Sequence, residues 1–128
     1  MTETLVAAAR RAQQQAYAPY SRYQVGAALE AEDGQIYTGC NIENASFGLT
    51  ICAERTAVAT AVTAGARRFR RIAIVVGSEP PAMPCGACRQ VLAEFGLDLA
   101  GESVGPKTRV TWTLRNLLPD AFGPGNLA

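Results

Sequence analysis

Three cysteines at two places in the chain have the residue type and spacing to bind a metal ion. Cys85 and Cys88 form a C-x-x-C motif directly before a segment, 89–96, with the periodicity of a helix. Cys52 stands at the start of a second helix-like run, 53–64. Thiols at helix N-termini are biased toward the thiolate by the helix dipole and by the unpaired N–H groups there. Since two thiolates do not complete a metal site, we predict Cys52 as the third ligand.

Three protein ligands are typical of a catalytic zinc site, which leaves the fourth position for water. A structural site would need a fourth protein ligand, and because the chain contains no histidine, the candidate thiol is Cys40. We expect Cys40 to lie at the end of a strand as a small buried thiol instead. Two alternatives stay open: a structural zinc site that includes Cys40, and a redox dithiol at the C-x-x-C motif.

Glu54 is the predicted catalytic residue. A carboxylate two positions after a ligand can lie over the open coordination position without binding the metal. There it can take a proton from water and deliver it elsewhere, as the hydrolytic removal of an amine from an amidine-like carbon requires. Arg55 could donate to the thiolates and offset their negative charge from outside the ligand set. Without the cysteines, Glu54 would be an ordinary acidic residue in the first turn of a helix.

The composition is that of a globular protein, and we expect one domain that spans residues 1–128. Hydrophobic residues make up 48% of the chain and charged residues 18%. The net charge of +1 argues against a nucleic-acid partner, and the basic cluster 67–71 is predicted to be a solvated or subunit-contacting connector between a helix and a strand. No apolar run approaches the ~18 residues of a membrane span.

The cysteine content and the N-terminal segment bear on the compartment. Four cysteines without a signal-peptide pattern favour a reducing environment and metal or catalytic roles over disulfides. We therefore expect a cytoplasmic protein. The absence of histidine also excludes His-based triads and imidazole zinc ligands.

The elements that must position these residues follow an α, β, β, α, β, α order that ends in β-rich sequence. An Asp-Gly pair at 33–34 predicts a hairpin, and segment 41–51 is expected to be an irregular loop. The order predicts an α/β fold, a three-layer α/β/α sandwich around one mixed sheet of roughly five strands. Predicted helices span 2–15, 53–64, 89–96 and 115–118, and predicted strands span 24–30, 35–40, 71–77 and 108–114, with a further short strand within 97–104.

These residues resemble the cytidine deaminase family, in its small zinc-dependent form with three cysteine ligands. The zinc deaminase pattern is ligand-x-Glu followed by Pro-Cys-x-x-Cys, and here it reads Cys52-Ala53-Glu54 and Pro84-Cys85-Gly86-Ala87-Cys88. Cysteine stands where other branches have histidine. The resemblance covers nearly the whole chain, and further matching stretches are Tyr17–Ser21, Val25–Leu29, Gly39–Ala45, Cys88–Gln90 and Leu117–Pro119.

The resemblance implies a cytidine deaminase-like fold and the hydrolytic deamination of cytidine and 2′-deoxycytidine to the uridines, with release of ammonia, in pyrimidine salvage. It implies one zinc ion per subunit, a nucleoside as the small-molecule substrate, and a homotetramer with sites shared between subunits. The implied substrate-binding residues are Asn41 and Glu43 at the ribose, Tyr23 beside the nucleoside, Ala45 and Phe47 in the same loop, and Phe122 over the base of a neighbouring subunit.

Two residues depart from the family pattern. Tyr23 stands where the family usually has phenylalanine, and Phe47 stands where many relatives have tyrosine, so a hydroxyl contact to the ribose is absent there. Without the resemblance, Asn41 and Glu43 are polar loop residues, and Tyr23 and Phe122 are ordinary aromatic residues. A deaminase of cytosine-bearing antibiotic nucleosides and a structural zinc module that binds a partner remain alternatives, although the Asn-Ile-Glu sequence at 41–43 favours the ordinary nucleoside.

Overall fold

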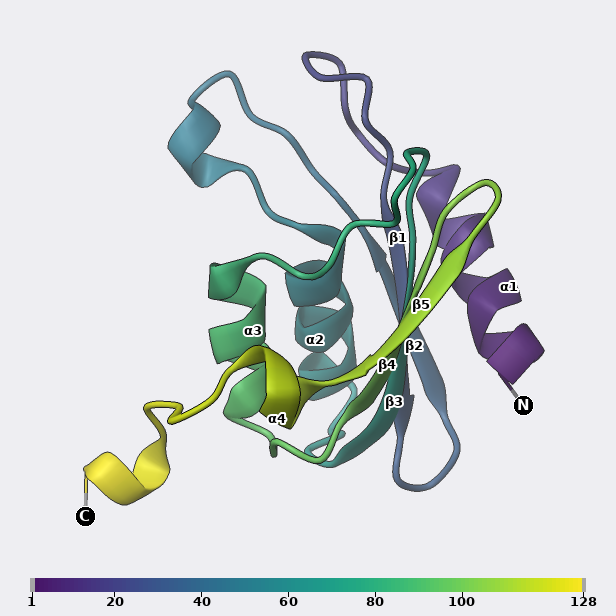
Figure 1. Ribbon diagram of the computed structural model, residues 1–128. Coiled ribbons are helices and arrows are strands. Elements are labelled where there is room, and N and C mark those ends of the chain that lie inside the picture. The colour runs from purple at the N-terminus through teal and green to yellow at the C-terminus, as the bar shows by residue number, and fades with distance from the viewer. Residues whose placement is uncertain (1, 128) are drawn as a thin grey trace.

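A mixed sheet forms the centre of the computed structural model, which describes residues 2–127 (Figure 1). The five strands lie in the order β2-β1-β3-β4-β5. Strands β3 and β4 are parallel, and the other neighbours are antiparallel. The predicted mixed sheet of roughly five strands is therefore confirmed. The strands are β1 (Gly26–Ala31), β2 (Ile36–Cys40), β3 (Phe69–Val75), β4 (Ala100–Val104) and β5 (Arg109–Thr113).

Helices cover both faces of this sheet, as the three-layer prediction requires. Figure 1 shows α1 on one face and α2 and α3 side by side on the other. No helix within residues 2–127 combines the length and the apolar character that crossing a membrane demands. The described helices are α1 (Thr2–Gln13), α2 (Ala53–Thr63), α3 (Gly86–Ala93) and α4 (Leu114–Leu117), with two short 3-10 turns, η1 (Phe47–Leu49) and η2 (Pro124–Asn126).

The alternation of side chains along β3 explains why the sheet carries helices on both faces. Successive residues of a strand point to opposite faces. Ile72 and Ile74 accordingly join the apolar cluster beneath α2 and α3. Ala73 and Val75 join a second cluster that includes Leu5 of α1. A strand buried on both faces is a near-continuous apolar run, and this run made the centre of the sheet recognisable in the sequence.

The parallel pairing of β3 and β4 requires a crossover connection. After β3 the chain passes through a connector, residues 78–84, and then through α3 before it enters β4. The C-x-x-C motif therefore lies within the crossover. Helix α2 lies before this crossover in the sequence and follows β2 and the irregular segment 41–51.

Gly39 in β2 fixes where α2 lies. A Cβ atom at this position would come within 2.3 Å of the backbone nitrogen of Ala57 and 2.7 Å of the carbonyl oxygen of Ala53. Both alanines are fully buried. The first turns of α2 thus rest directly on the strand backbone, and this contact places Cys52, the N-cap residue of α2.

Several predicted boundaries are wrong by one to three residues. Helix α3 begins at Gly86 instead of residue 89, because the backbone N–H of Arg89 donates to the carbonyl of Cys85 and closes an earlier turn. Strand β3 spans 69–75 instead of 71–77, so Phe69 through Arg71 belong to a strand and not to a connector. The Nε atom of Arg71 lies 2.9 Å from a carboxylate oxygen of Glu30 in β1, across the strand pair. Helix α1 ends at residue 13 instead of 15.

We predict that Gly39→Ala destabilises the fold and weakens zinc binding together. The added Cβ must displace the backbone of α2, and overpacking of this kind costs about 1–3 kcal/mol. Urea unfolding and zinc content measure the two effects. Gly77→Ala is the control, since a Cβ at residue 77 would meet nothing within 4 Å. A Gly39→Ala variant as stable as the control would contradict the close approach of helix and strand.

Candidate metal centre

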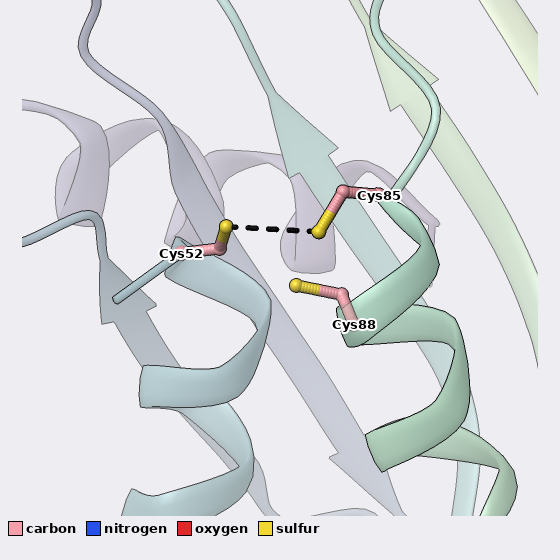
Figure 2. Close-up of side chains that lie close together, drawn as sticks. All are labelled: Cys52, Cys85 and Cys88. Carbon is pink, nitrogen blue, oxygen red and sulfur yellow. Dashed lines mark hydrogen bonds between the residues drawn. The ribbon is translucent and has the colours of Figure 1, made fainter. Parts of the chain in front are cut away.

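The three predicted ligands lie together where the N-termini of α2 and α3 meet. Cys52 is the N-cap of α2, Cys85 is the N-cap of α3, and Cys88 lies in the first turn of α3. Their sulfur atoms all lie within 4.8 Å of one another, and the sulfurs of Cys52 and Cys85 are 3.9 Å apart. Figure 2 shows all three sulfurs pointing into one space between the two helices. Within residues 2–127 this is the one cluster of three or more potential ligands.

The donor set fits one zinc ion. Tetrahedral zinc with Zn–S bonds of about 2.3 Å places its sulfur ligands about 3.8 Å apart, which is close to the separation of Cys52 and Cys85. Cys40 ends strand β2 as predicted, although it is half-buried and not fully buried. It is not part of the cluster, so the structure gives no support to a four-cysteine structural site. Three protein ligands are the number typical of a catalytic zinc site.

The electrostatics of the sulfurs indicate that the cluster needs a cation. Hydrogen bonds from Cys88 and from Arg55 lower the pKa of the Cys52 thiol to about 5. The pKa of Cys88 is raised, because its proton is bound by the sulfur of Cys52 and because the side chain is buried. The protein by itself thus stabilises one thiolate and opposes a second one. A divalent cation removes this conflict, because each sulfur can then carry its charge against the metal.

Arg55 lies beside the sulfurs, where the sequence predicted it. Its Nη2 atom donates to the sulfur of Cys52 at 3.5 Å. Hydrogen bonds to Cys52 and Cys88 raise the pKa of the guanidinium, so it remains charged. If Arg55 offsets the negative charge of the thiolates, it must contact a sulfur in this way.

Glu54 lies in the first turn of α2, and its side chain lines a cavity together with Cys52 and Cys85. The residue is only 6% exposed. Burial, and after it the charge of Cys52, raises the pKa of the Glu54 carboxyl to about 7. At neutral pH both its protonated and its ionised form are therefore populated, and a group that gives and takes protons works best in this range.

The cavity beside the cysteines has a volume of about 200 Å³ and contains two of the predicted substrate residues, Tyr23 and Asn41. The amide of Asn41 donates to the carbonyl of Tyr23 at 2.8 Å and accepts from the N–H of Val25 at 2.9 Å. A larger cavity, of about 580 Å³, lies over β3, β4 and β5 and includes none of the predicted site residues. Because Cys52, Glu54 and Cys85 line the smaller cavity, it is the candidate reaction cavity.

Glu43 and Phe47 line a neighbouring cavity of about 370 Å³, which shares the lining residue Thr50 with the cavity beside the cysteines. The carboxylate of Glu43 accepts from the backbone N–H groups of Tyr20 and Ser21 at 2.9 and 3.2 Å and from the hydroxyl of Ser21. The hydrogen bonds from Ser21, together with that from Tyr20, lower the pKa of Glu43. Phe47 is 75% exposed, with its ring centroid 6.1 Å from that of Tyr20.

The remaining two predicted residues lie apart from both cavities. Ala45 is exposed and lines neither of them. Phe122 is 58% exposed and lines a separate hollow beside α3, where Gln90 donates to its carbonyl at 2.9 Å. The assigned roles of both residues in substrate binding stay predictions.

Several residues that line the reaction cavity were not singled out in the sequence. Thr50 and Met83 each stand two positions before a cysteine of the cluster, Cys52 and Cys85. Side chains two apart in extended chain project to the same side, so this spacing could have identified them. The others become neighbours only through packing, and they are Val25, Ala53, Ile74, Val76 and Ala82.

Known proteins resemble this chain closely. The family model described as the cytidine and deoxycytidylate deaminase zinc-binding region matches residues 1–100. A cytidine deaminase of Sporosarcina psychrophila is 58% identical over 129 residues, which cover 98% of this chain and 94% of that protein. One of Mycobacterium tuberculosis is 47% identical over 114 residues, covering 88% and 82%. The crystal structure of cytidine deaminase from Burkholderia pseudomallei superposes with a TM-score of 0.92 at 46% identity, covering 95% and 99%.

We predict that Cys85→Ala abolishes stoichiometric zinc binding, because two cysteines remain at a site that needs three. Cys40→Ala is the matched control and should bind one zinc ion per chain, since Cys40 lies outside the cluster. Metal analysis of the purified variants measures both. Tightly held zinc in Cys85→Ala, with loss of zinc in Cys40→Ala, would mean that Cys40 is a ligand.

Proposed function

The chain belongs to the cytidine and deoxycytidylate deaminase family, and we propose that it catalyses the zinc-dependent hydrolysis of cytidine and 2′-deoxycytidine to uridine and 2′-deoxyuridine, with release of ammonia. One observation carries the proposal. A buried carboxylate, Glu54, lies beside a cluster of three cysteines at the wall of a cavity. The family relationship and this constellation point to the same reaction.

Cys52, Cys85 and Cys88 would hold one zinc ion, which when bound would supply Lewis acidity and make a water molecule nucleophilic at neutral pH. The protein's part is to hold the three sulfurs close together and to offset part of their negative charge. The N-termini of α2 and α3 direct partial positive charge at the sulfurs. Arg55 adds a full positive charge through its hydrogen bond to Cys52.

Glu54 moves the protons of the reaction. Hydrolysis at the amidine carbon of cytosine transfers one proton from water to the ring nitrogen and requires another for the departing amine. Because the pKa of Glu54 lies at about 7, its carboxylate can accept the first proton and release it again at the same pH. Burial keeps bulk water away from this exchange.

The two adjacent cavities suit the two parts of a nucleoside. We assign the base to the cavity that Tyr23 and Glu54 line, and the ribose to the boundary, beside Asn41, with the cavity that Glu43 and Phe47 line. Thr50 lines both cavities and so supports this division, because one nucleoside can extend from the first cavity into the second. Ala45 belongs to the same loop, and Phe47 contacts the sugar without a hydroxyl.

We further propose a cytoplasmic homotetramer of single-domain subunits, 1–128, in which Phe122 covers the base bound by a neighbour. Two observations support the shared site. Phe122 is exposed and does not line the reaction cavity of its own chain. Large exposed apolar side chains gather on the segments that line the second cavity, as is common at protein interfaces. They include Tyr17, Tyr20, Ile42, Phe47, Leu49 and Ile51.

The decisive assay measures ammonia release from cytidine by the wild-type protein and by Glu54→Gln. The variant should keep its fold and its zinc, and it should lose about 10²- to 10⁴-fold in kcat, because the proton carrier is lost at little change in volume. A variant within a few-fold of wild type at full zinc occupancy would contradict the assignment. A structural zinc module would release no ammonia from either protein, and an antibiotic-nucleoside deaminase would prefer the antibiotic over cytidine.

We predict that deletion of residues 122–128 weakens substrate binding at every site and spares zinc. Mixing this truncated protein with full-length Glu54→Gln should restore activity after subunits exchange, because some sites then combine an intact Glu54 with a donated Phe122. Co-assembly is verified separately by native mass spectrometry. Hybrid oligomers that form without any recovery of activity would show that the aromatic ring acts within its own chain.

A further inference from the structure

The connector between β3 and α3, residues 78–84, builds one wall of the reaction cavity. Ala82 and Met83 line the cavity, and Pro84 leads directly into the metal ligand Cys85. None of residues 78–84 belongs to a helix or strand. Backbone pairing within an element therefore does not fix this wall, and its position depends on what the connector is attached to.

Glu79 attaches the connector to the turn between β4 and β5. Its carboxylate accepts hydrogen bonds from the backbone N–H groups of Lys107 and Thr108, at 2.7 and 3.2 Å, and from the hydroxyl of Thr108. Figure 1 shows the connector and this turn at the same end of the sheet. Backbone packing reinforces the attachment, since a Cβ on Gly105 would come within 2.8 Å of the carbonyl of Ser78.

The residue before Glu79, Ser78, contacts Tyr23, which also lines the cavity. The hydroxyl of Ser78 and the hydroxyl of Tyr23 are 2.8 Å apart and share a hydrogen bond. The backbone of Tyr23 is held in turn by Asn41. At the other end of the connector, Nε of Arg89 donates to the carbonyl of Pro84 at 2.7 Å. The connector is thus held at both ends, and Glu79 supplies side-chain hydrogen bonds to a part of the fold outside the cavity and the metal helix.

We propose that Glu79 is a positioning residue for the nucleoside cavity: by holding the β4–β5 turn it keeps the 78–84 connector against Tyr23 and fixes the wall that Ala82 and Met83 form. This inference rests on the proposed function. Glu79 does not line the cavity, so it acts through the connector. Loss of the anchor lets the wall move away from the substrate and weakens ground-state binding, while Glu54 and the cysteines stay in place on their helices.

The test compares Glu79→Ala with Asp33→Ala in steady-state deamination of cytidine. Asp33 is a matched control, because its carboxylate accepts from the N–H of Gln35 at 3.0 Å in the β1–β2 turn, at the other end of the sheet. Glu79→Ala should raise KM roughly three- to tenfold, the range expected for one lost anchoring interaction, with kcat within about twofold and zinc retained. Asp33→Ala should leave KM unchanged.

Two further variants test whether the rise in KM follows from the lost hydrogen bonds of Glu79. Glu79→Gln keeps one acceptor oxygen and should raise KM less than Glu79→Ala. Thr108→Val removes the hydroxyl donor at similar size and should also raise KM, with no additional rise when it is combined with Glu79→Ala. Equal KM values for Glu79→Ala and Asp33→Ala would overturn the proposal, and so would independent, multiplying effects of the changes at 79 and 108.

Hydrogen exchange of a peptide that spans residues 78–88 gives a readout that does not depend on turnover. Its amides should exchange faster in Glu79→Ala than in wild type and Asp33→Ala. Unchanged exchange would overturn the proposal even if KM changed. If the wild-type protein releases no ammonia from cytidine, the proposed function fails, and the exchange comparison still decides whether Glu79 holds the cavity wall.

Discussion

Repulsion between three sulfur atoms within 4.8 Å of one another is the constraint on which the arrangement of this protein depends. One thiolate is stabilised by hydrogen bonds from Cys88 and Arg55, but the next is opposed by the first. Two helix N-termini and one guanidinium reduce the cost, and a zinc ion completes the balance. The sheet serves this end by holding α2 and α3 on one face, with their first turns toward each other.

Burial, and after it the negative charge of Cys52, suits the neighbouring carboxyl of Glu54 to proton transfer. A glutamate in an exposed first turn would be fully ionised at neutral pH. Glu54 is buried beside Cys52, and its pKa rises to about 7. The sulfur ligands and the proton-carrying acid are thus electrostatically linked, because the charge of Cys52 adds to the effect of burial on the Glu54 carboxyl.

Residues close in sequence to a recognisable motif were predictable, and those brought together by packing were not. Cys52, Cys85, Cys88 and Glu54 follow from spacing at two helix starts, and the central strand follows from an apolar run. The start of α3 was placed too late because glycine at 86 carries no helical signal. The contact of Glu79 with the β4–β5 turn joins residues 28 positions apart and depends on a glycine at 105, so no local sequence pattern predicts it.

The parallel pairing of β3 and β4 determines when the metal site can form. The chain between these strands contains α3 and both cysteines of the C-x-x-C motif, and Cys85 is 33 residues from Cys52. Closing such a crossover is a non-local and therefore slow event in folding. An unfolded chain offers zinc a pair of neighbouring thiols, and the third arrives only when the crossover has packed on the sheet. We therefore expect metal capture at full affinity to be a late step in folding that follows the formation of the topology.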